Sequence, residues 1–396
     1  MGRVDLADMQ QAPASGIPEV TLLRRYLRKA HDFRYKQGAY ANIARRSLIR
    51  DGFGYFGGEC FAINGWAGAF TSVATPPAAP IIDEAVDYNW FTNATANSYL
   101  LGHISGSGSA TSWARGAAAF EFGRKTSKVV FVGGFGSISE DWDQPNAAMR
   151  SILAGNASGD SLGLTCYWSG RPHFYTHHMG MGETIGYATC LSQNAGLYNL
   201  AGVSAADRYQ PPGSSSGEIH LGLMGDPALR MHMVEPPRKL VASSANGQVN
   251  LSWAASTETG LQGYYVYRGA TAAGPFTRLT PTAQTGTTYT DSTVTAGQSY
   301  TYMVRTLKLE SVSCGSYFNL SHGSLATLTV NAGVVVLTTP SPVVPFVSTI
   351  ASVPAVGAVV STKTSMPDVV DWLPARSVTS ARIVYVPSLR EVGASV

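Results

Sequence analysis

The hydrophobic pattern near the start of the chain is that of an amphipathic helix beginning at Pro18. Apolar residues recur there at helical spacing, while arginines occupy the opposite face. These apolar residues are Leu23, Tyr26, Leu27, Ala30 and Phe33. The pattern predicts a helix that packs one side against a core and leaves its basic side in solvent.

Four apolar runs farther along have the length and composition of strands. They lie at 98–101, 128–132, 162–168 and 219–224. The stretch 104–118, rich in Ser, Gly and Ala, predicts a loop. Helices are predicted at 147–153, with Ser139 or Asp143 as the N-cap, and at 183–194. This alternation of strand, loop and helix predicts an α/β domain with a largely parallel sheet over residues 1–236.

The pattern changes after Pro236 and Pro237, where the apolar runs become short and strictly alternating. Val249, Leu251 and Trp253 share one face of a predicted strand. Further alternating runs lie at 263–268, 300–304 and 325–330. Turn residues separate these runs at about 8–12 residues, which is the spacing of a β-sandwich. The sequence therefore predicts an all-β sandwich domain over residues 237–331.

The last 65 or so residues, 332–396, are rich in Val, Ser, Thr, Ala and Pro and predict a low-complexity linker or tail. Prolines interrupt the apolar stretch 334–360, so no transmembrane segment is predicted. The first residues lack the apolar core of a signal peptide. If the protein is secreted, we therefore expect its natural start to lie upstream of Met1.

The amino-acid composition limits the classes of partner that this protein is expected to bind. Charged residues make up only 13% of the chain, and its net charge is +3, so no nucleic-acid partner is expected. Low charge fits an extracellular or cell-surface protein. The four cysteines (Cys60, Cys166, Cys190 and Cys314) are too widely spaced for a zinc site. Cys190 lies in a predicted helix among small residues, where we expect it to be packed.

Residues 237–331 resemble a fibronectin type III domain. The segments that carry the resemblance are LSW (251–253), GYYVYRG (263–269), GPFTRL (274–279), YTD (289–291) and SYTYMVRT (299–306). Trp253 matches the core tryptophan of that family, and Tyr300 or Tyr302 matches its corner tyrosine. The resemblance implies a binding or spacer module.

Residues 20–236 resemble the C-terminal part of a gingipain-family, caspase-like cysteine peptidase domain. The resemblance rests on GDPALR (225–230) before the sandwich, on the Gly102–His103 pair, on KVVFV (128–132) and on GETIGYATCLSQN (182–194). It implies a caspase-like α/β sheet and assigns His103 as the catalytic base. It also implies that the domain can bind calcium.

The position of the nucleophile departs from that family. A cysteine peptidase needs a thiolate beside an imidazole, and the family places its cysteine after the strand that follows the histidine. Here that position holds Gly133, Gly134 and Phe135. We therefore expect an inactive peptidase domain. Ser137 and Cys166 are the alternative nucleophiles.

Two polar stretches offer other site residues. His173, His177 and His178 lie in a run rich in aromatic residues, which predicts a ligand-binding pocket, and the spacing of the first two also allows a metal.

The second stretch contains Glu140, Asp141 and Asp143. Carboxylate oxygens suit Ca²⁺, although helix capping explains the same residues without an ion. No other cofactor is required.

Three functions remain open. The first is a secreted or cell-surface protein with an inactive gingipain-like domain and a fibronectin type III binding or spacer module. The second is an active cysteine peptidase that uses His103 with a cysteine not yet identified. The third is an extracellular protein associated with carbohydrate. A protein or polysaccharide surface is the expected partner.

Overall fold

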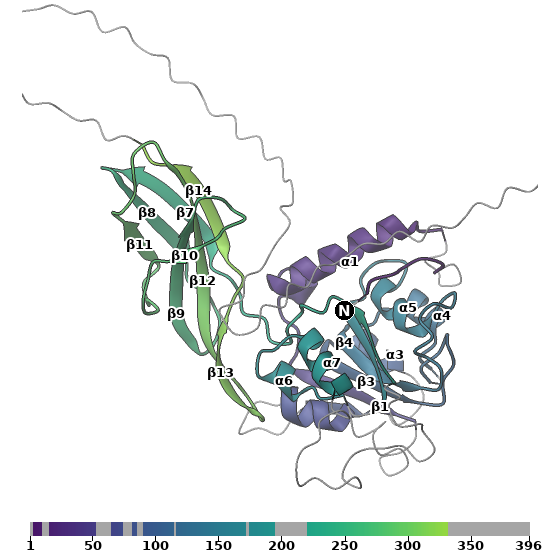
Figure 1. Cartoon of the computed structure of the whole chain (residues 1–396). Helices are drawn as coiled ribbons and strands as arrows, with labels where there is room; N and C mark the ends of the chain where they lie inside the picture. The colour runs from purple at the N-terminus through teal and green to yellow at the C-terminus, as the bar shows by residue number, and fades with distance from the viewer. Residues whose placement is uncertain are drawn as a thin grey trace, which may run out of the picture.

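The computed structural model describes residues 3–9, 16–52, 65–73, 81–84, 90–114, 116–171, 174–194 and 220–331 (Figure 1). The tail predicted at 332–396 therefore lies outside the described residues. The described chain forms an α/β domain and a β-sandwich that lie side by side. In Figure 1 the sandwich stands on the left and the α/β domain on the right.

The α/β domain is built on a six-stranded sheet with the order β2-β1-β3-β4-β5-β6. Its strands are β1 (Arg46–Asp51), β2 (Ile81–Glu84), β3 (Tyr99–Gly106), β4 (Val129–Gly136), β5 (Thr165–Arg171) and β6 (His220–Gly225). Its helices are α1 (Glu19–Arg34), η1 (Gly38–Tyr40), η2 (Ala69–Val73), α3 (Trp90–Ala96), α4 (Ala119–Arg124), α5 (Ala148–Ala154), α6 (His177–Gly180) and α7 (Ile185–Asn194).

The sheet is mixed. Strands β1 to β5 pair in parallel, whereas β6 runs antiparallel to β5. The prediction of a largely parallel sheet is therefore confirmed, with β6 as its antiparallel last strand. Helices cover both faces: Trp90 of α3 packs on Gly102, and Gly65, just before η2, packs on the neighbouring His103. Successive residues of a strand face opposite sides, so these two segments lie on opposite faces of the sheet.

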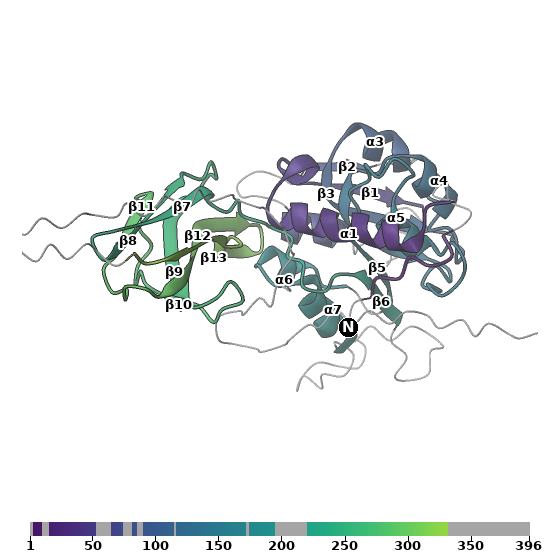
Figure 2. The same ribbon diagram turned by 90° about the horizontal axis from the view of Figure 1, so that it is seen from above.

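Helix α1 covers the edge of the sheet at which β5 begins and β6 ends, and Figure 2 shows it running across the ends of the strands. The Tyr26 hydroxyl donates to the carbonyl of Leu164 at 2.9 Å and accepts from the amide of Asp226 at 2.7 Å. The Asp226 carboxylate also receives a hydrogen bond from Arg34. Asp226 therefore holds α1 against the end of β6, which gives the GDPALR segment a structural role.

The buried face of α1 differs from the predicted one. Leu22, Tyr26, Lys29, Ala30 and Phe33 are buried, whereas Leu27 is 49% exposed. Lys29 is tolerated because its ammonium group donates to the carbonyls of Leu153 and Gly163. Burial lowers the pKa of Lys29 to about 7. The buried face of α1 is therefore rotated slightly around the helix axis from the face that the sequence predicts.

Two local predictions in this domain are also wrong. The loop predicted at 104–118 begins late, because β3 continues to Gly106 and His103 lies within the strand. Neither Ser139 nor Asp143 caps α5, whose N-cap residue is Ala147 and makes no side-chain cap. The Ser139 hydroxyl donates instead to the carbonyl of Gly136 at 2.7 Å, which closes the turn after β4.

The second domain is a fibronectin type III-like β-sandwich. Strands β10, β9, β12 and β13 form one sheet, with β14 added to β12, and β11, β8 and β7 form the other. Their bounds are β7 (Arg238–Ala245), β8 (Gln248–Ala254), β9 (Leu261–Gly269), β10 (Thr277–Arg278), β11 (Thr288–Asp291), β12 (Ser299–Val312), β13 (Gly315–Leu320) and β14 (Ser324–Thr329).

The alternation predicted in the sandwich is confirmed. Val249, Leu251 and Trp253 all face the core, which they share with Tyr302 of the opposite sheet. The two candidate corner tyrosines have different bonds. Tyr302 donates to Asp291, whereas the Tyr300 hydroxyl accepts from a backbone amide five residues upstream, which is the bond expected of a tyrosine corner.

Candidate functional site

His103 lies near the middle of β3, between β1 and β4. It pairs in register with Ile49 on one side and Gly133 on the other. The side chain is only 1% exposed, and the helical segment that begins at Gly65 packs against it. A Cβ atom added to Gly65 would lie 2.7 Å from the His103 ring. The imidazole is therefore enclosed on the face of the sheet that carries η2.

Tyr167 fills the space next to His103. Gly133, Tyr167 and His103 lie on one row across three neighbouring strands and face the same side. A Cβ atom on Gly133 would overlap the Tyr167 ring, which stacks on Phe174 with a centroid distance of 4.0 Å. In the part of the chain that the structure describes, the buried Tyr167 hydroxyl has no hydrogen-bond partner. Its pKa is raised by burial and by the neighbouring Cys166.

The structure does not bring Cys166 and His103 together. Cys166 directly precedes Tyr167 on β5, so its side chain points to the opposite face of the sheet. It is fully buried, and burial raises the pKa of its thiol well above the usual value. A thiol that resists ionisation is a poor nucleophile. Ser137, the other alternative, is exposed in the turn after β4.

The remaining described thiols lie elsewhere. Cys190 is exposed on α7, so the expectation that it is packed is wrong. Its position on the outer side of a short helix explains the error, because small neighbours do not distinguish a buried face from an exposed one. Cys314 lies in the turn between β12 and β13, where its Sγ donates to the carbonyl of His177 at 3.4 Å. Cys60 lies outside the described residues.

His177 and His178 begin the short helix α6, and their rings lie 4.0 Å apart between centroids. The His178 ring also packs edge-on against Tyr187 of α7. Burial, and then the neighbouring His177, lower the pKa of His178. His173 lies outside the described residues. These contacts place the two described histidines in an aromatic cluster that joins α6 to α7.

Glu140, Asp141 and Asp143 lie in the turns between β4 and α5. Asp141 and Asp143 are exposed, and Asp143 accepts a long hydrogen bond of 3.5 Å from Gln144. Among the described residues, these three carboxylates do not converge, and no group of three metal-binding side chains forms there.

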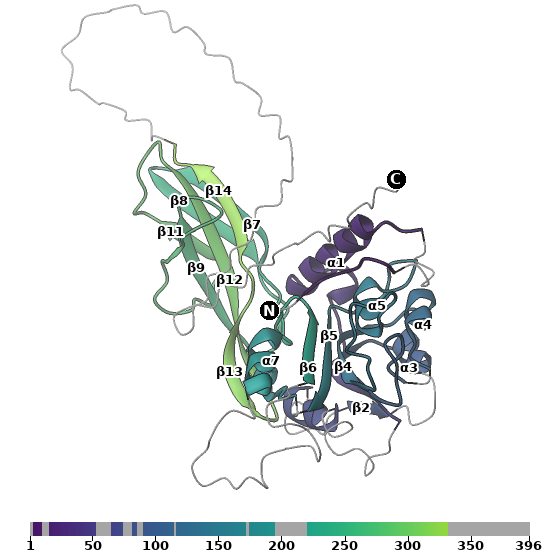
Figure 3. The same ribbon diagram turned by 45° about the vertical axis from the view of Figure 1, so that its right-hand side comes forward.

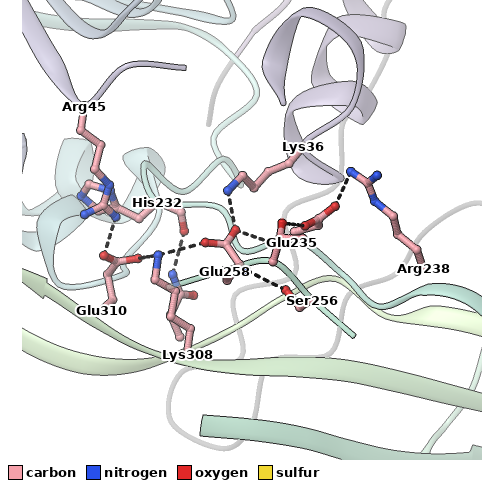
Figure 4. Close-up of polar contacts among 11 residues, drawn as sticks. Lys36, Arg45, His232, Glu235, Arg238, Ser256, Glu258, Lys308 and Glu310 are labelled. Atoms are coloured by element: carbon pink, nitrogen blue, oxygen red, sulfur yellow. Dashed lines mark hydrogen bonds and ion pairs between the residues drawn. The ribbon is translucent and has the colours of Figure 1, made fainter. Parts of the chain in front are cut away.

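The densest group of buried charges lies between the two domains. Glu258 and Glu310 of the sandwich are 6% and 2% exposed at their side chains. Figure 4 shows Lys36 and Arg45 of the α/β domain bonded to these carboxylates, with Lys308 between them. The Lys308 ammonium lies 3.1 Å from Glu258 and 3.4 Å from Glu310. We call these five residues the interdomain ion network.

The network keeps its carboxylates charged although they are buried. Burial alone would raise the pKa of Glu258, but the bonds from Lys36 and from the Glu235 amide hold it below the usual value. Burial opposes ionisation of Glu310 in the same way, and Arg45, His232 and Lys308 together lower its pKa. Buried ion pairs are costly to break from one side, and two pairs of this network, Lys36–Glu258 and Arg45–Glu310, join the two domains.

His232 lies under the network and contacts both domains. Its Nε2 lies 2.7 Å from the carbonyl of Ser72, and its own carbonyl accepts from the Asn319 side chain at 2.8 Å. Burial, and then the charge of Arg45, lower the pKa of His232 to about 4. The imidazole is therefore neutral near pH 7.

The end of the sandwich makes further contacts beside the network. Tyr317 of β13 packs on Gly182, where an added Cβ atom would overlap the ring. The amide of Cys314 donates to the carbonyl of Thr71 at 3.3 Å. Figure 3 shows β13 passing beside α7. The hairpin of β12 and β13 thus reaches the same side of the α/β domain as η2 and α6.

Sequence reasoning missed this interface, although one signal was present. In β12 the even-numbered residues face the inside of the sandwich, and Tyr302 and Val304 are buried there. Lys308 and Glu310 occupy inward positions too, while Leu309 faces out and is 41% exposed. Charges at inward positions indicate that the strand has left the sandwich core and contacts something else.

No protein-family model matches this chain. An amylopullulanase from Thermoanaerobacterium saccharolyticum is 35% identical over 82 residues, which is 21% of this chain and 6% of that protein. Chitinase A1 from Niallia circulans is 29% identical over 157 residues, which is 39% of this chain and 20% of that protein. The chain therefore corresponds to only a small part of these curated relatives.

The solved structures that resemble this chain match only about a quarter of it. An Fn3-like protein from Clostridium thermocellum is 27% identical with a TM-score of 0.20, and the match covers 24% of this chain and 92% of that one. The pectate lyase Pel3 from Pectobacterium carotovorum is 20% identical with a TM-score of 0.19, and the match covers 26% of each chain. In the described part of the chain, no helix is both long and apolar enough to cross a membrane.

Proposed function

We propose that this chain belongs to an extracellular protein associated with polysaccharide, and that its α/β domain is not a working cysteine peptidase. The sandwich acts as a spacer that holds the α/β domain in one orientation. The observation that carries the assignment of an inactive peptidase is the Tyr167 ring, which occupies the space beside His103 where a nucleophile on β4 would have to lie.

The space beside His103 argues against peptidase chemistry. A base must lie within about 3 Å of the group that it deprotonates. The neighbouring position on β4 holds Gly133, and neither a thiol nor a hydroxyl fits there without moving Tyr167. Cys166 faces the other side of the sheet.

The association with polysaccharide is supported by the two curated relatives, which are named amylopullulanase and chitinase. The low content of charged residues supports an extracellular location. The spacer role is supported by the interdomain ion network. A hinge between independent domains would leave such carboxylates in solvent, whereas Glu258 and Glu310 are buried.

The peptidase part is tested by labelling the purified chain with a thiol-reactive peptidyl probe, alongside the variant His103→Ala. We expect no labelling that depends on His103. Labelling of one cysteine that disappears in His103→Ala, while both proteins have the same circular dichroism spectrum, would overturn the inactive assignment and identify the nucleophile.

A second variant tests the role of Tyr167. Gly133→Cys would place a thiol in the family's position, but the Tyr167 ring occupies that space. We expect Gly133→Cys to lose about 1–3 kcal/mol of unfolding free energy through overpacking and to remain unlabelled by the probe. Unchanged stability together with labelling would show that the space is open.

The polysaccharide part is tested by co-sedimentation of the intact chain with insoluble chitin and starch. Bovine serum albumin, a protein without this sandwich, serves as the control. Retention above the control on either material supports the proposal, and recovery of the whole chain in the supernatant with both contradicts it.

A further inference from the structure

An open cavity of about 740 Å³ lies where the two domains meet. One wall comes from the end of α1 and from η1, and the other from the start of β7 and the turn between β13 and β14. The residues used below are His31, Tyr35, Lys36, Arg238 and Lys239, all of which line it. Its volume is within the range of roughly 300–1,000 Å³ that is usual for ligand sites.

Three aromatic rings stand in a row at this cavity. His31 stacks on Tyr35 with 4.6 Å between centroids, and Tyr35 meets His322 of the sandwich at 5.3 Å. His31 and Tyr35 line the cavity itself. Tyr35 is half-buried between the other two rings, whereas His31 at the end of the row is exposed, so the outer face of His31 is the ring surface open to a ligand. The C–H face of a sugar ring is a suitable partner for such a surface.

The charge at the cavity is mainly positive. Lys36, Arg238 and Lys239 line it together with a single carboxylate, Glu235. Lys36 is bonded to Glu258 and Arg238 to Glu235, so both are partly neutralised. Among the ion pairs of the described residues none includes Lys239, which is exposed. Lys239 is therefore the cation best placed to meet an anionic ligand.

The backbone at Lys239 is unusual. Its φ angle is 54°, in the left-handed region that a residue with a side chain rarely adopts. It lies in an irregularity of the pairing between β7 and β8, between Arg238 and Val241. Strained backbone of this kind is concentrated at functional sites. At Lys239 it also points the side chain in a direction that a regular strand would not give it.

We propose that this interdomain cavity binds an acidic oligosaccharide, with Lys239 pairing with a carboxylate of the sugar and the His31 ring, held by Tyr35, packing on its apolar face. This inference rests on the proposed association with polysaccharide and specifies its chemistry. A neutral sugar would leave Lys239 unused, and an acidic peptide would leave the aromatic row unused.

The test is isothermal titration calorimetry of the intact chain with trigalacturonic acid at low ionic strength. Maltotriose serves as a neutral sugar and triglutamate as an acidic peptide. We expect trigalacturonic acid to bind more tightly than both. Lys239→Ala should weaken binding by about fivefold, the loss of roughly one exposed ion pair. Arg28→Ala removes the same charge from the exposed side of α1, away from the cavity, and should change binding less than about twofold.

Three outcomes would overturn the inference. They are the absence of binding to trigalacturonic acid, equal binding of maltotriose or of triglutamate, and equal effects of Lys239→Ala and Arg28→Ala. The co-sedimentation with chitin and starch is a separate measurement. If the intact chain is retained there but does not bind trigalacturonic acid, only the cavity assignment fails.

Discussion

Glu310 is the residue whose loss should reveal how firmly the two domains are joined. Its side chain is 2% exposed and pairs with Arg45 of the α/β domain and with Lys308 of its own strand. Glu310→Gln keeps the shape of the side chain and removes its charge. Two cations then lose a buried partner, while Glu258 remains 3.1 Å from the Lys308 ammonium.

The size of the effect follows from the exposure of the partners. Removing one member of a buried ion pair costs about 3–5 kcal/mol when the other charge stays buried. The Arg45 side chain is 32% exposed and can turn toward water, and Lys308 keeps its bond to Glu258. We therefore expect Glu310→Gln to lower the unfolding free energy by about 2–3 kcal/mol, which is below that range because both cations keep a way to be solvated or paired.

Urea unfolding followed by tryptophan fluorescence measures this change. With a slope of about 3 kcal/mol per molar urea, the midpoint should fall by somewhat less than 1 M. The matched control is Lys125→Met, which removes a surface pair with Glu121 on α4, where the two atoms lie 2.9 Å apart. A surface pair at this i, i+4 spacing contributes only about 0.3–0.5 kcal/mol. If Glu310→Gln costs no more than Lys125→Met, the interdomain charges do not stabilise the fold and our reasoning is wrong.

Three further predictions use the same protein. His232 has a pKa of about 4 when folded and about 6.5 when unfolded, so stability should be lost as pH falls from 6.5 to 4, by about 3 kcal/mol. His232→Gln should lack this part of the pH dependence in urea titrations, and an unchanged profile would contradict the assignment. Lys36 lies two residues after the end of α1 with a φ of 49°, so Lys36→Gly should be more stable than Lys36→Ala by about 1 kcal/mol, since both lose the ion pair and only alanine keeps the strain. Maleimide followed by peptide mapping should label exposed Cys190 in the folded protein and Cys166 only after unfolding; early labelling of Cys166 would show that its burial is wrong.

Much of the fold followed from the hydrophobic pattern. The predicted strands at 128–132 and 249–253 are β4 and β8, because continuous and alternating apolar runs report directly on burial. The antiparallel direction of β6 did not follow, because burial does not encode the direction of a strand. The pattern also placed the end of the β3 strand too early, since Gly and Ser in the strand look like a loop.

The candidate sites depended on information that a linear pattern does not contain. The sequence identified His103 but could not show that Tyr167, on a strand two places away, would fill the space beside it. The same limit hid the interdomain ion network. Lys36 and Glu258 meet only because α1 and the sandwich pack together, and neither residue stands out among its own neighbours. Only the inward positions of Lys308 and Glu310 indicated a partner outside the sandwich.

The interdomain ion network also restricts how this sandwich can be exchanged during evolution. A domain that shares no buried charges with its neighbour can be moved between genes without leaving unpaired charges on either domain. Removing residues 238–329 here would leave Lys36 and Arg45 without the carboxylates that neutralise them, and a foreign sandwich would have to supply both charges at the same places. Substitutions at Glu310 should therefore persist only when Arg45 or Lys308 changes with it, so that the two domains evolve as one unit.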